Sequence, residues 1–293
     1  MSSEKISIAI IFTCYNRAEK TRACIESLQS QASHYLIDTD YYICDDGSTD
    51  DTYNIIRTLL PYAKLIEGNG QLFWVRGMHK AMQESIKSHH DFYLMVNDDV
   101  EFNSNMFDVM LDSYYEVLKS DNLEKSVTSF CGIVGSTLKR DKSDISYGGW
   151  KYVRNLKIGR AELIRPNGKT QICDIANWNC FMVPETIIQN VGIIDSYYHH
   201  SKGDFDYSMM MKHKKYDIYI AKDYVGIVDN NKDSTIHKKK VGQVLKQLFS
   251  VKGIPPKYEF YYFTKNWGVF GFFFFCYSFP KTIVHEILNM KRQ

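Results

Sequence analysis

The stretch Phe92-Tyr93-Leu94-Met95-Val96-Asn97-Asp98-Asp99-Val100 decides the fold of this 293-residue chain. Its first five residues are apolar and β-prone, and the run is too short for an ordinary helix, so it predicts a buried strand. Asp98 and Asp99 stand where that strand should end, and Glu101 follows two residues later. In an open parallel α/β sheet, ligands bind outside the carboxyl ends of the strands. Carboxylate oxygens there suit Mg²⁺ or Mn²⁺ held against a diphosphate, and a solvated turn before the next helix is the alternative.

A second acidic cluster follows an earlier strand. Tyr41–Cys44 predicts a short strand, and Asp45-Asp46-Gly47-Ser48 comes directly after it. Gly47 permits a tight turn, and Asp and Ser side chains suit the start of the next helix. Capping needs only one such residue, so two carboxylates indicate a partner with donor groups, such as a base or a ribose. A first strand at Ile6–Phe12 ends at Thr13-Cys14-Tyr15-Asn16-Arg17. We therefore expect three strand ends to line one crevice.

The order of elements predicts an α/β fold. Strand-like runs alternate with helical spacing, at 6–12, 41–44, 65–66 and 92–96 for strands and 18–28, 51–60, 75–86 and 106–118 for helices. Such alternation implies a mostly parallel sheet with right-handed crossovers. After residues 130–135 the pattern changes, and residues 144–175, with Asn167-Gly168 as a hairpin signal, predict a smaller antiparallel region. Further elements are expected as helices at 187–191 and 205–214 and strands at 218–220 and 225–228.

Composition excludes several classes of protein. The net charge of +2 gives no electrostatic reason to expect a nucleic-acid partner. The seven cysteines are scattered without a Cys-x-x-Cys pair, so neither a zinc site nor a disulfide framework is predicted, and reduced cytosolic thiols are expected. The apolar run near the N-terminus is short and leads into polar residues, which favours a first strand over a signal peptide.

The last part of the chain, residues 236–293, is basic and aromatic. Lys238-Lys239-Lys240 precedes helical spacing of apolar residues, and Gly268–Tyr277 is an uncharged, Phe-rich run bracketed by Lys265 and Lys281. The run is shorter than the ~20 residues that span a bilayer. A helical tail lying on a membrane surface is expected, and packing on the core or in a dimer interface is the alternative.

Five motifs follow one another along residues 5–230. They are Thr13-Cys14-Tyr15-Asn16-Arg17, Asp45-Asp46-Gly47-Ser48 with Asp50, Gly68-Asn69-Gly70 through Arg76-Gly77-Met78, Asn97-Asp98-Asp99, and Gly203-Asp204-Phe205-Asp206-Tyr207-Ser208. In this order they resemble the family 2 glycosyltransferases of the GT-A fold, which transfer sugars from nucleotide-sugar donors with inversion. The chain looks most like the bacterial branch that builds O-antigens, capsules and cell-wall polysaccharides, including rhamnosyltransferase-like members. The resemblance implies a glycosyltransferase domain over 1–235, with a nucleotide-sugar half at about 1–136 and an acceptor half at about 137–235.

The resemblance also assigns roles in binding the donor. Thr13 and Tyr15 should border the base and Asp46 the base or ribose, whereas Asp45 holds the loop. The residues expected to contact the nucleotide sugar are Thr13, Tyr15, Asn16, Arg17, Asp46, Gly70, Arg76 and Asp98. Within this set, Arg76 is expected at the diphosphate and Asp98 at the ribose or donor sugar.

For a Mn²⁺ or Mg²⁺ cofactor, Asp99 matches the last carboxylate of the family's Asp-x-Asp-like motif. Glu101 is expected on the same face if the chain stays extended, which makes it the second predicted ligand. His237 or Asp229 is the candidate for the late ligand found in many family members. A bound metal would neutralise the departing diphosphate.

The second half of the chain must supply a general base. By resemblance the tetrad Gly203-Asp204-Phe205-Asp206 makes Asp204 the base, with Asp206 positioning the acceptor or the loop. The alternative is that Asp204 only caps the following helix. His200 is a further candidate near the acceptor, and Trp178 is expected either to stack on a sugar or to lie in the core.

The sequence therefore predicts an inverting, metal-dependent hexosyl- or deoxyhexosyltransferase. Its partners would be a UDP- or dTDP-sugar and a glycan or lipid-linked glycan acceptor, at the inner face of the cell membrane, with a homodimer as a further expectation. The competing functions are a sugar-1-phosphate nucleotidylyltransferase and a nucleotide- or glycan-binding scaffold without catalysis.

Overall fold

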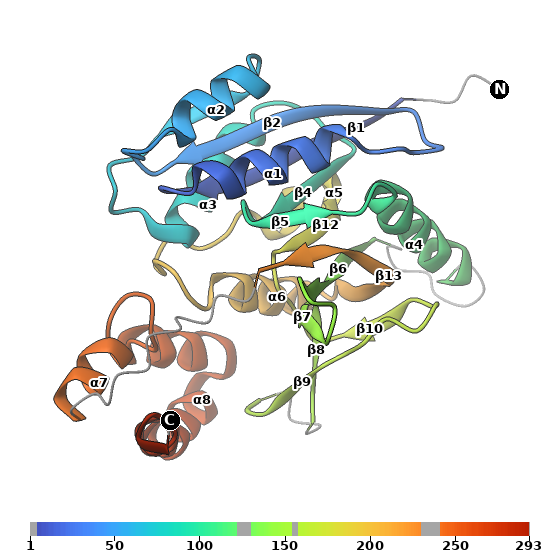
Figure 1. The fold of residues 1–293 in the computed structure, drawn as a ribbon. Coiled ribbons are helices and arrows are strands. Elements are labelled where there is room, and N and C mark those ends of the chain that lie inside the picture. The colour runs from blue at the N-terminus through green and yellow to red at the C-terminus, as the bar shows by residue number, and fades with distance from the viewer. Residues whose placement is uncertain (1–4, 122–129, 154–157, 230–240, 293) are drawn as a thin grey trace.

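The computed structural model describes residues 5–121, 130–153, 158–229 and 241–292, and it confirms the predicted α/β class (Figure 1). The strands are β1 (Ile6–Cys14), β2 (Ile37–Asp45), β3 (Lys64–Glu67), β4 (Phe92–Val96), β5 (Val100–Phe102), β6 (Cys131–Lys139), β7 (Ile145–Tyr147), β8 (Gly149–Tyr152), β9 (Ala161–Leu163), β10 (Gln171–Cys173), β11 (Ile175–Ala176), β12 (Cys180–Pro184) and β13 (Asp217–Val228). The helices are α1 (Ala18–Gln29), α2 (Thr52–Leu59), α3 (Phe73–Ser85), α4 (Met106–Asp121), α5 (Glu185–Val191), α6 (Gly203–His213), α7 (Val241–Leu248) and α8 (Pro256–Arg292).

The central sheet is mostly parallel. Its strand order is β10-β13-β6-β12-β4-β1-β2-β3, with β5 pairing to β13 and β7 to β6. Strands β4, β1, β2 and β3 run parallel to one another, as do β6 and β13. Strand β12 lies antiparallel between β4 and β6. A small antiparallel sheet, β11-β8-β9, accompanies it, as predicted. The carboxyl ends of β1, β2 and β4 therefore meet at one edge of the sheet.

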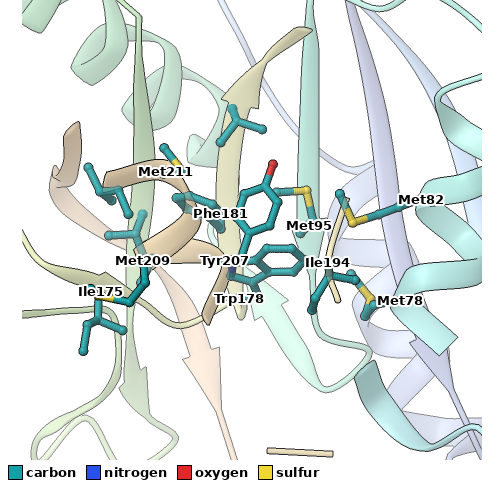
Figure 2. Packing of buried hydrophobic residues seen from close by; sticks show 14 of the residues in the cluster. Met78, Met82, Met95, Ile175, Trp178, Phe181, Ile194, Tyr207, Met209 and Met211 are labelled. Atoms are coloured by element: carbon teal, nitrogen blue, oxygen red, sulfur yellow. The ribbon is translucent and has the colours of Figure 1, made fainter. Parts of the chain in front are cut away.

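Helices cover both faces of this sheet. Successive side chains of β1 point to opposite faces, so each face carries its own apolar cluster. Ile8, Ile10 and Phe12 belong to the apolar cluster that includes residues of α1 and α4. Ala9 and Ile11 belong to the cluster on the other face, which includes residues of α3, α5, α6 and α8. Figure 2 shows the centre of this second cluster, where aromatic rings and methionines interdigitate. The C-terminal helix α8 thus contributes to the same core as α3, α5 and α6.

In the second half, one local prediction was wrong and one buried strand was not predicted. Asn167-Gly168 does not join a hairpin, because β9 pairs with β8 of the small sheet whereas β10 pairs with β13 of the central sheet. Gly168 still makes the expected turn, with φ +84°. Strand β12 was not predicted, although all five of its residues are buried. Its central, doubly covered position removes the alternating pattern that marks a half-buried strand.

The tail forms two helices, and its last helix bends back on itself. Gly268 in α8 has a non-helical backbone, with φ 57° and ψ −134°. The rings of Phe260 and Phe272 lie 6.1 Å apart, and those of Phe263 and Phe274 lie 5.2 Å apart. In a straight helix, residues twelve positions apart would be separated by about 18 Å. The halves of α8 on either side of Gly268 therefore fold against each other.

The predicted boundary between the domain and the tail, at residues 235 and 236, lies outside the described residues. One helical segment, Pro256–Leu288, is long and apolar enough to cross a membrane by length and composition alone. The bend at Gly268 divides this segment.

Candidate active site

The loops after β1, β2 and β4 meet, as the sequence predicts. Thr13 Oγ1 donates a hydrogen bond to the Cys44 carbonyl oxygen at 2.8 Å. The Asn16 side-chain oxygen accepts from the backbone N–H of Thr49 at 2.7 Å, with Asn16 itself at φ +51°. Close packing against α3 completes the wall, because a Cβ on Gly77 would lie 2.2 Å from Thr13 Oγ1. These contacts build a pocket at the carboxyl edge of the sheet.

Most of the predicted donor contacts line this pocket. Its walls are formed by Thr13, Cys14, Tyr15, Arg17, Asp46, Gly70, Phe73, Trp74, Asp98, His200 and Lys252. Two predicted donor contacts, Asn16 and Arg76, do not line it. Asn16 instead joins the first two loops, and Arg76 Nε donates to the Ser196 carbonyl oxygen at 3.1 Å. Arg76 therefore contacts the second half of the chain in this structure.

Asp46 shapes the loop before α3. One carboxylate oxygen accepts the backbone N–H groups of Asn69 and Gly70 at 3.2 and 3.0 Å. The other accepts those of Leu72 and Phe73 at 2.9 and 3.0 Å. The loop-holding role expected of Asp45 thus falls to Asp46. Asp45 instead accepts from the backbone and hydroxyl of Ser48, at 2.9 and 2.6 Å, within its own turn.

Arg17 bridges the two carboxylates after β4. Its Nη1 lies 3.0 Å from Asp98 Oδ1 and 2.9 Å from Asp99 Oδ2. Burial raises the pKa of Asp98 to about 7, against the opposing charge of Arg17. The remaining oxygens, Asp98 Oδ2 and Asp99 Oδ1, are buried without a hydrogen-bond partner among the described residues. Buried polar atoms normally have partners, and carboxylate oxygens without one, on two adjacent residues, suit a hard divalent cation.

Glu101 does not join these carboxylates. The chain turns at Asp98 and Asp99 before β5 begins at Val100, so the extended geometry on which the prediction rested is absent. Glu101 instead pairs with Arg140, which also pairs with Asp229. Within the described residues, no three His, Cys, Asp or Glu side chains gather in a group that could hold a metal. His237 lies outside the described residues.

The candidate general base Asp204 lines a cavity together with Asp98 and Asp99. A second cavity is lined by Arg17, Trp74, Asn97, Asp98, Asp99, Tyr147, Asn177, Trp178, Asn179, His200, Ser201, Lys202, Asp204, Phe205 and Lys252. Asn177 Nδ2 donates to Asp204 Oδ2 at 3.2 Å, and the backbone N–H of Phe205 donates to Asp204 Oδ1 at 2.9 Å. Burial raises the pKa of Asp204 to about 6. A carboxylate with a pKa near the working pH is suited to general-base catalysis.

The capping alternative for Asp204 does not fit the helix start. Helix α6 begins at Gly203, and its N-cap is Lys202, with φ 72° and no side-chain capping bond. Gly203 is required there, because a Cβ would lie 2.7 Å from Val75 of α3. Asp204 therefore sits inside the first turn of α6. Residues 195–204, which lead into this turn, are called the base loop below.

Three other predicted residues have clear positions. His200 lines both cavities, and its pKa is lowered by burial and by the nearby charges of Lys252 and Arg17. Asp206 is fully buried and ion-paired to α8. Trp178 is 1% exposed. Its ring centroid lies 5.0 Å from that of Tyr207 (Figure 2) and 6.0 Å from that of Trp74. Of its two expected roles, the structure therefore supports core packing and not stacking on a sugar.

Lys252 was missed by the sequence analysis. It lies between α7 and α8, lines both cavities, and forms no ion pair with another described residue. It brings a third basic side chain beside Arg17 and His200. No sequence signal marks it, because it belongs to the tail and not to any of the five motifs.

The family comparison agrees with this geometry. Residues 9–122 match the model of the family described as "Glycosyl transferase family 2", which supports a glycosyltransferase domain in the first half of the chain. The matched range includes β1, β2 and β4 with all three strand-end loops. None of the curated proteins matches the chain.

Solved structures give a more distant likeness. The chain is similar to TarS of S. aureus, with 12% identity, a TM-score of 0.49, and coverage of 77% of this chain and 37% of that one. For residues 1–349 of TarS in complex with UDP, the identity is 13%, the TM-score 0.49, and the coverage 77% and 61%. For the mannosyltransferase PcManGT of Pyrobaculum calidifontis, in complex with GDP-Man and Mn²⁺, these values are 13%, 0.49, 92% and 73%. The chain thus spans less than two thirds of the two TarS structures.

Proposed function

We propose that this protein is an inverting, metal-dependent glycosyltransferase that moves a sugar from a nucleoside diphosphate donor to a hydroxyl group of a glycan acceptor. The observation that carries the proposal is one continuous site: Asp98 and Asp99 line the same cavity as Asp204. Two carboxylates with free oxygens and a separate carboxylate suited to proton removal are what such a transfer requires.

The donor would lie in the pocket at the ends of β1, β2 and β4. Tyr15, 47% exposed at its mouth, offers a ring for the base, and the loop held by Asp46 offers backbone near the ribose. Arg17, His200 and Lys252 supply positive or proton-donating groups for the diphosphate. Asp98 and Asp99 would hold Mn²⁺ or Mg²⁺, which when bound neutralises charge on the leaving diphosphate.

Asp204 would take the proton from the acceptor hydroxyl. The acceptor oxygen then forms a bond to the anomeric carbon while the bond from that carbon to the diphosphate oxygen breaks. The bonding electron pair leaves with the nucleoside diphosphate, and attack from the opposite face inverts the anomeric configuration. Asn177 donates to Asp204 and so holds its carboxylate in place. Its pKa of about 6 keeps most of it ionised at neutral pH.

The acceptor is proposed to be a membrane-linked glycan in the assembly of a cell-surface polysaccharide such as an O-antigen or a capsule. Support comes from α8, whose second half exposes Val269, Phe270, Phe272, Phe273 and Tyr277. An aromatic face of this kind can rest in the interface of a bilayer without crossing it. The protein would then work at the inner face of the cell membrane, on UDP- or dTDP-linked hexoses or deoxyhexoses. A homodimer through the same face is the competing arrangement.

A thermal-shift screen tests the donor assignment. UDP, dTDP, GDP and their sugar derivatives would each be added with and without Mn²⁺, because a ligand that binds only the native state raises the melting temperature. We expect at least one nucleoside diphosphate to stabilise the protein more in the presence of Mn²⁺ than in its absence. The same screen with Asp99→Ala is the control. If none of the nucleotides or nucleotide sugars raised the melting temperature, the proposal would be rejected.

The two competing functions have separate signatures. A nucleotidylyltransferase would release pyrophosphate from a nucleoside triphosphate and a sugar 1-phosphate. A scaffold without catalysis would bind the donor but release no nucleoside diphosphate from it, either to water or to an acceptor.

A further inference from the structure

Helix α8 is tied to the turn that carries the proposed base. Asp206, two residues after Asp204, is fully buried. Its Oδ2 lies 2.6 Å from Lys265 Nζ, and its Oδ1 accepts from Asn266 Nδ2 at 2.9 Å. Both partners come from α8, about sixty residues later in the chain. Among the residues that the structure describes, the only positive charge paired with the fully buried carboxylate of Asp206 is therefore that of Lys265 in the tail.

The same lysine also holds the start of the base loop. Lys265 Nζ lies 2.8 Å from Asp195 Oδ2, and the hydroxyl of Tyr261 donates to that oxygen at 3.0 Å. Although burial opposes its charge, the hydrogen bonds to Asp195 and Asp206 raise the pKa of Lys265. Lys265 thus stays charged and joins the first residue of the base loop to the first turn of α6.

Two further contacts fix the middle of the base loop to α8. Lys202, the N-cap of α6, lies 3.1 Å from the buried carboxylate of Glu259, and its ammonium lies 5.0 Å from the ring centroid of Tyr262. His199, next to the cavity residue His200, is hydrogen-bonded to Tyr258. Asp195, His199 and Lys202 of the base loop therefore each have a polar partner on α8.

We propose that α8 clamps the base loop, with Lys265 and Asn266 as positioning residues that hold Asp206 and so orient Asp204. The tail is then part of the catalytic unit, whatever its second half contacts. This inference rests on the proposed function for the identity of the reaction, but the contacts that carry it do not depend on the donor. Asp206 would act on the structure of the loop and would not touch the substrate.

The test removes the positive charge of the Lys265–Asp206 ion pair in one variant and keeps it in another. Lys265→Met leaves Asp206 buried without a counter-charge, an arrangement that is strongly destabilising in proteins. Displacement of the first turn of α6 should lower kcat by about 10²-fold, as small misplacements of catalytic groups do. The affinity for the nucleoside diphosphate, measured by titration, should change much less than kcat, because the donor pocket is built from the first half of the chain apart from His200 and Lys252. Lys265→Arg should keep most of the activity.

A double variant distinguishes positioning from a direct role of Asp206 and protects the test against simple unfolding. In Asp206→Asn, the Asn side chain can still bond to Asn266 and Lys265 keeps Asp195 as a partner, so activity should fall much less than in Lys265→Met. In Lys265→Met with Asp206→Asn, no unpaired charge remains at residue 206, and activity should recover relative to Lys265→Met alone. Lys281→Met, on the outer part of α8, is the matched control. A loss of activity in Asp206→Asn as large as that in Lys265→Met, without recovery in the double variant, would overturn the proposal.

Hydrogen–deuterium exchange of peptides covering residues 195–206 gives a readout independent of turnover. Exchange there should rise in Lys265→Met and return toward the wild-type rate in the double variant. If wild-type protein turns over a donor while exchange in Lys265→Met stays at the wild-type rate, the clamp is refuted and the proposed function stands. If exchange rises but no donor is ever bound, the clamp stands and the proposed function fails.

Discussion

Replacing Asp204 by Asn is expected to remove proton transfer while leaving the donor site intact. The Asn side chain has nearly the same size but cannot accept a proton at neutral pH. Loss of a positioned general base lowers the rate by about 10²–10⁴-fold, which corresponds to about 2.7–5.5 kcal/mol in activation free energy. Asp204 also accepts from Asn177 and from the Phe205 backbone through different oxygens. Asn has only one acceptor oxygen, so a further loss of about 1 kcal/mol in stability is expected.

The pH dependence gives a second measure of the same residue. Burial raises the pKa of Asp204 to about 6, so it is about 90% ionised at pH 7 and about 10% ionised at pH 5. Because the base must be ionised to act, kcat at saturating donor and metal should fall about tenfold between these values. The residual activity of Asp204→Asn should lack this acidic limb.

The assay is release of nucleoside diphosphate, with donor affinity measured in parallel by titration. Turnover close to that of the wild type in Asp204→Asn would refute its role as base. Loss of activity together with loss of donor affinity would show that Asp204 supports the structure of the site and not its chemistry.

Three further predictions concern the donor and the tail. Asp99→Ala should abolish the Mn²⁺-dependent part of nucleoside diphosphate binding in thermal shift without lowering the melting temperature of the free protein; an unchanged Mn²⁺ effect would remove Asp99 as a ligand. Lys252→Ala should weaken binding of a nucleoside diphosphate about 10-fold, the lower end of the range for a charge-assisted hydrogen bond, but should not affect the matching nucleoside. Lys257→Ala is its control, and equal losses for nucleoside and diphosphate would place Lys252 away from the phosphates. Phe270→Ser with Phe273→Ser should reduce sedimentation with vesicles containing anionic phosphatidylglycerol; if wild-type protein does not sediment with them, the face is better tested as a dimer interface.

The strand-end loops could be predicted because their signals are local. The apolar run before Asp98 and the acidic turns after β2 and β4 specify where buried strands stop, and parallel order then brings those ends together. The approach of Arg17 to both Asp98 and Asp99 follows from the same topology, since β1 lies next to β4. The position of Asp204 was predicted from the resemblance of the tetrad Gly203-Asp204-Phe205-Asp206 to the family's motif, and helical spacing from Phe205 indicated the helix that follows.

The wrong or missing predictions concern residues whose position depends on contacts with distant parts of the sequence. Glu101 was placed with Asp99 on the assumption of an extended chain, but the turn before β5 directs it to Arg140. The partners of Asp206 come from α8, and nothing near residue 206 predicts them. Lys252 reaches the donor pocket from the tail in the same way. Residues that the tail contributes to the site cannot be predicted from the motifs in the first part of the chain, because those motifs contain no signal of their distant partners.

The central claim is that the carboxylates after β4 and the carboxylate on α6 serve one glycosyl transfer. The most direct measurement is nucleoside diphosphate release from a panel of UDP-, dTDP- and GDP-sugars, with bacterial membrane glycolipids as acceptors, for wild type, Asp99→Ala and Asp204→Asn. We predict Mn²⁺- or Mg²⁺-dependent release from one donor by the wild type. Asp99→Ala should lose both release and metal-dependent binding, whereas Asp204→Asn should lose release and keep binding. The account would be contradicted if Asp99→Ala and Asp204→Asn released nucleoside diphosphate as fast as the wild type. It would also be contradicted if the wild type bound none of the donors.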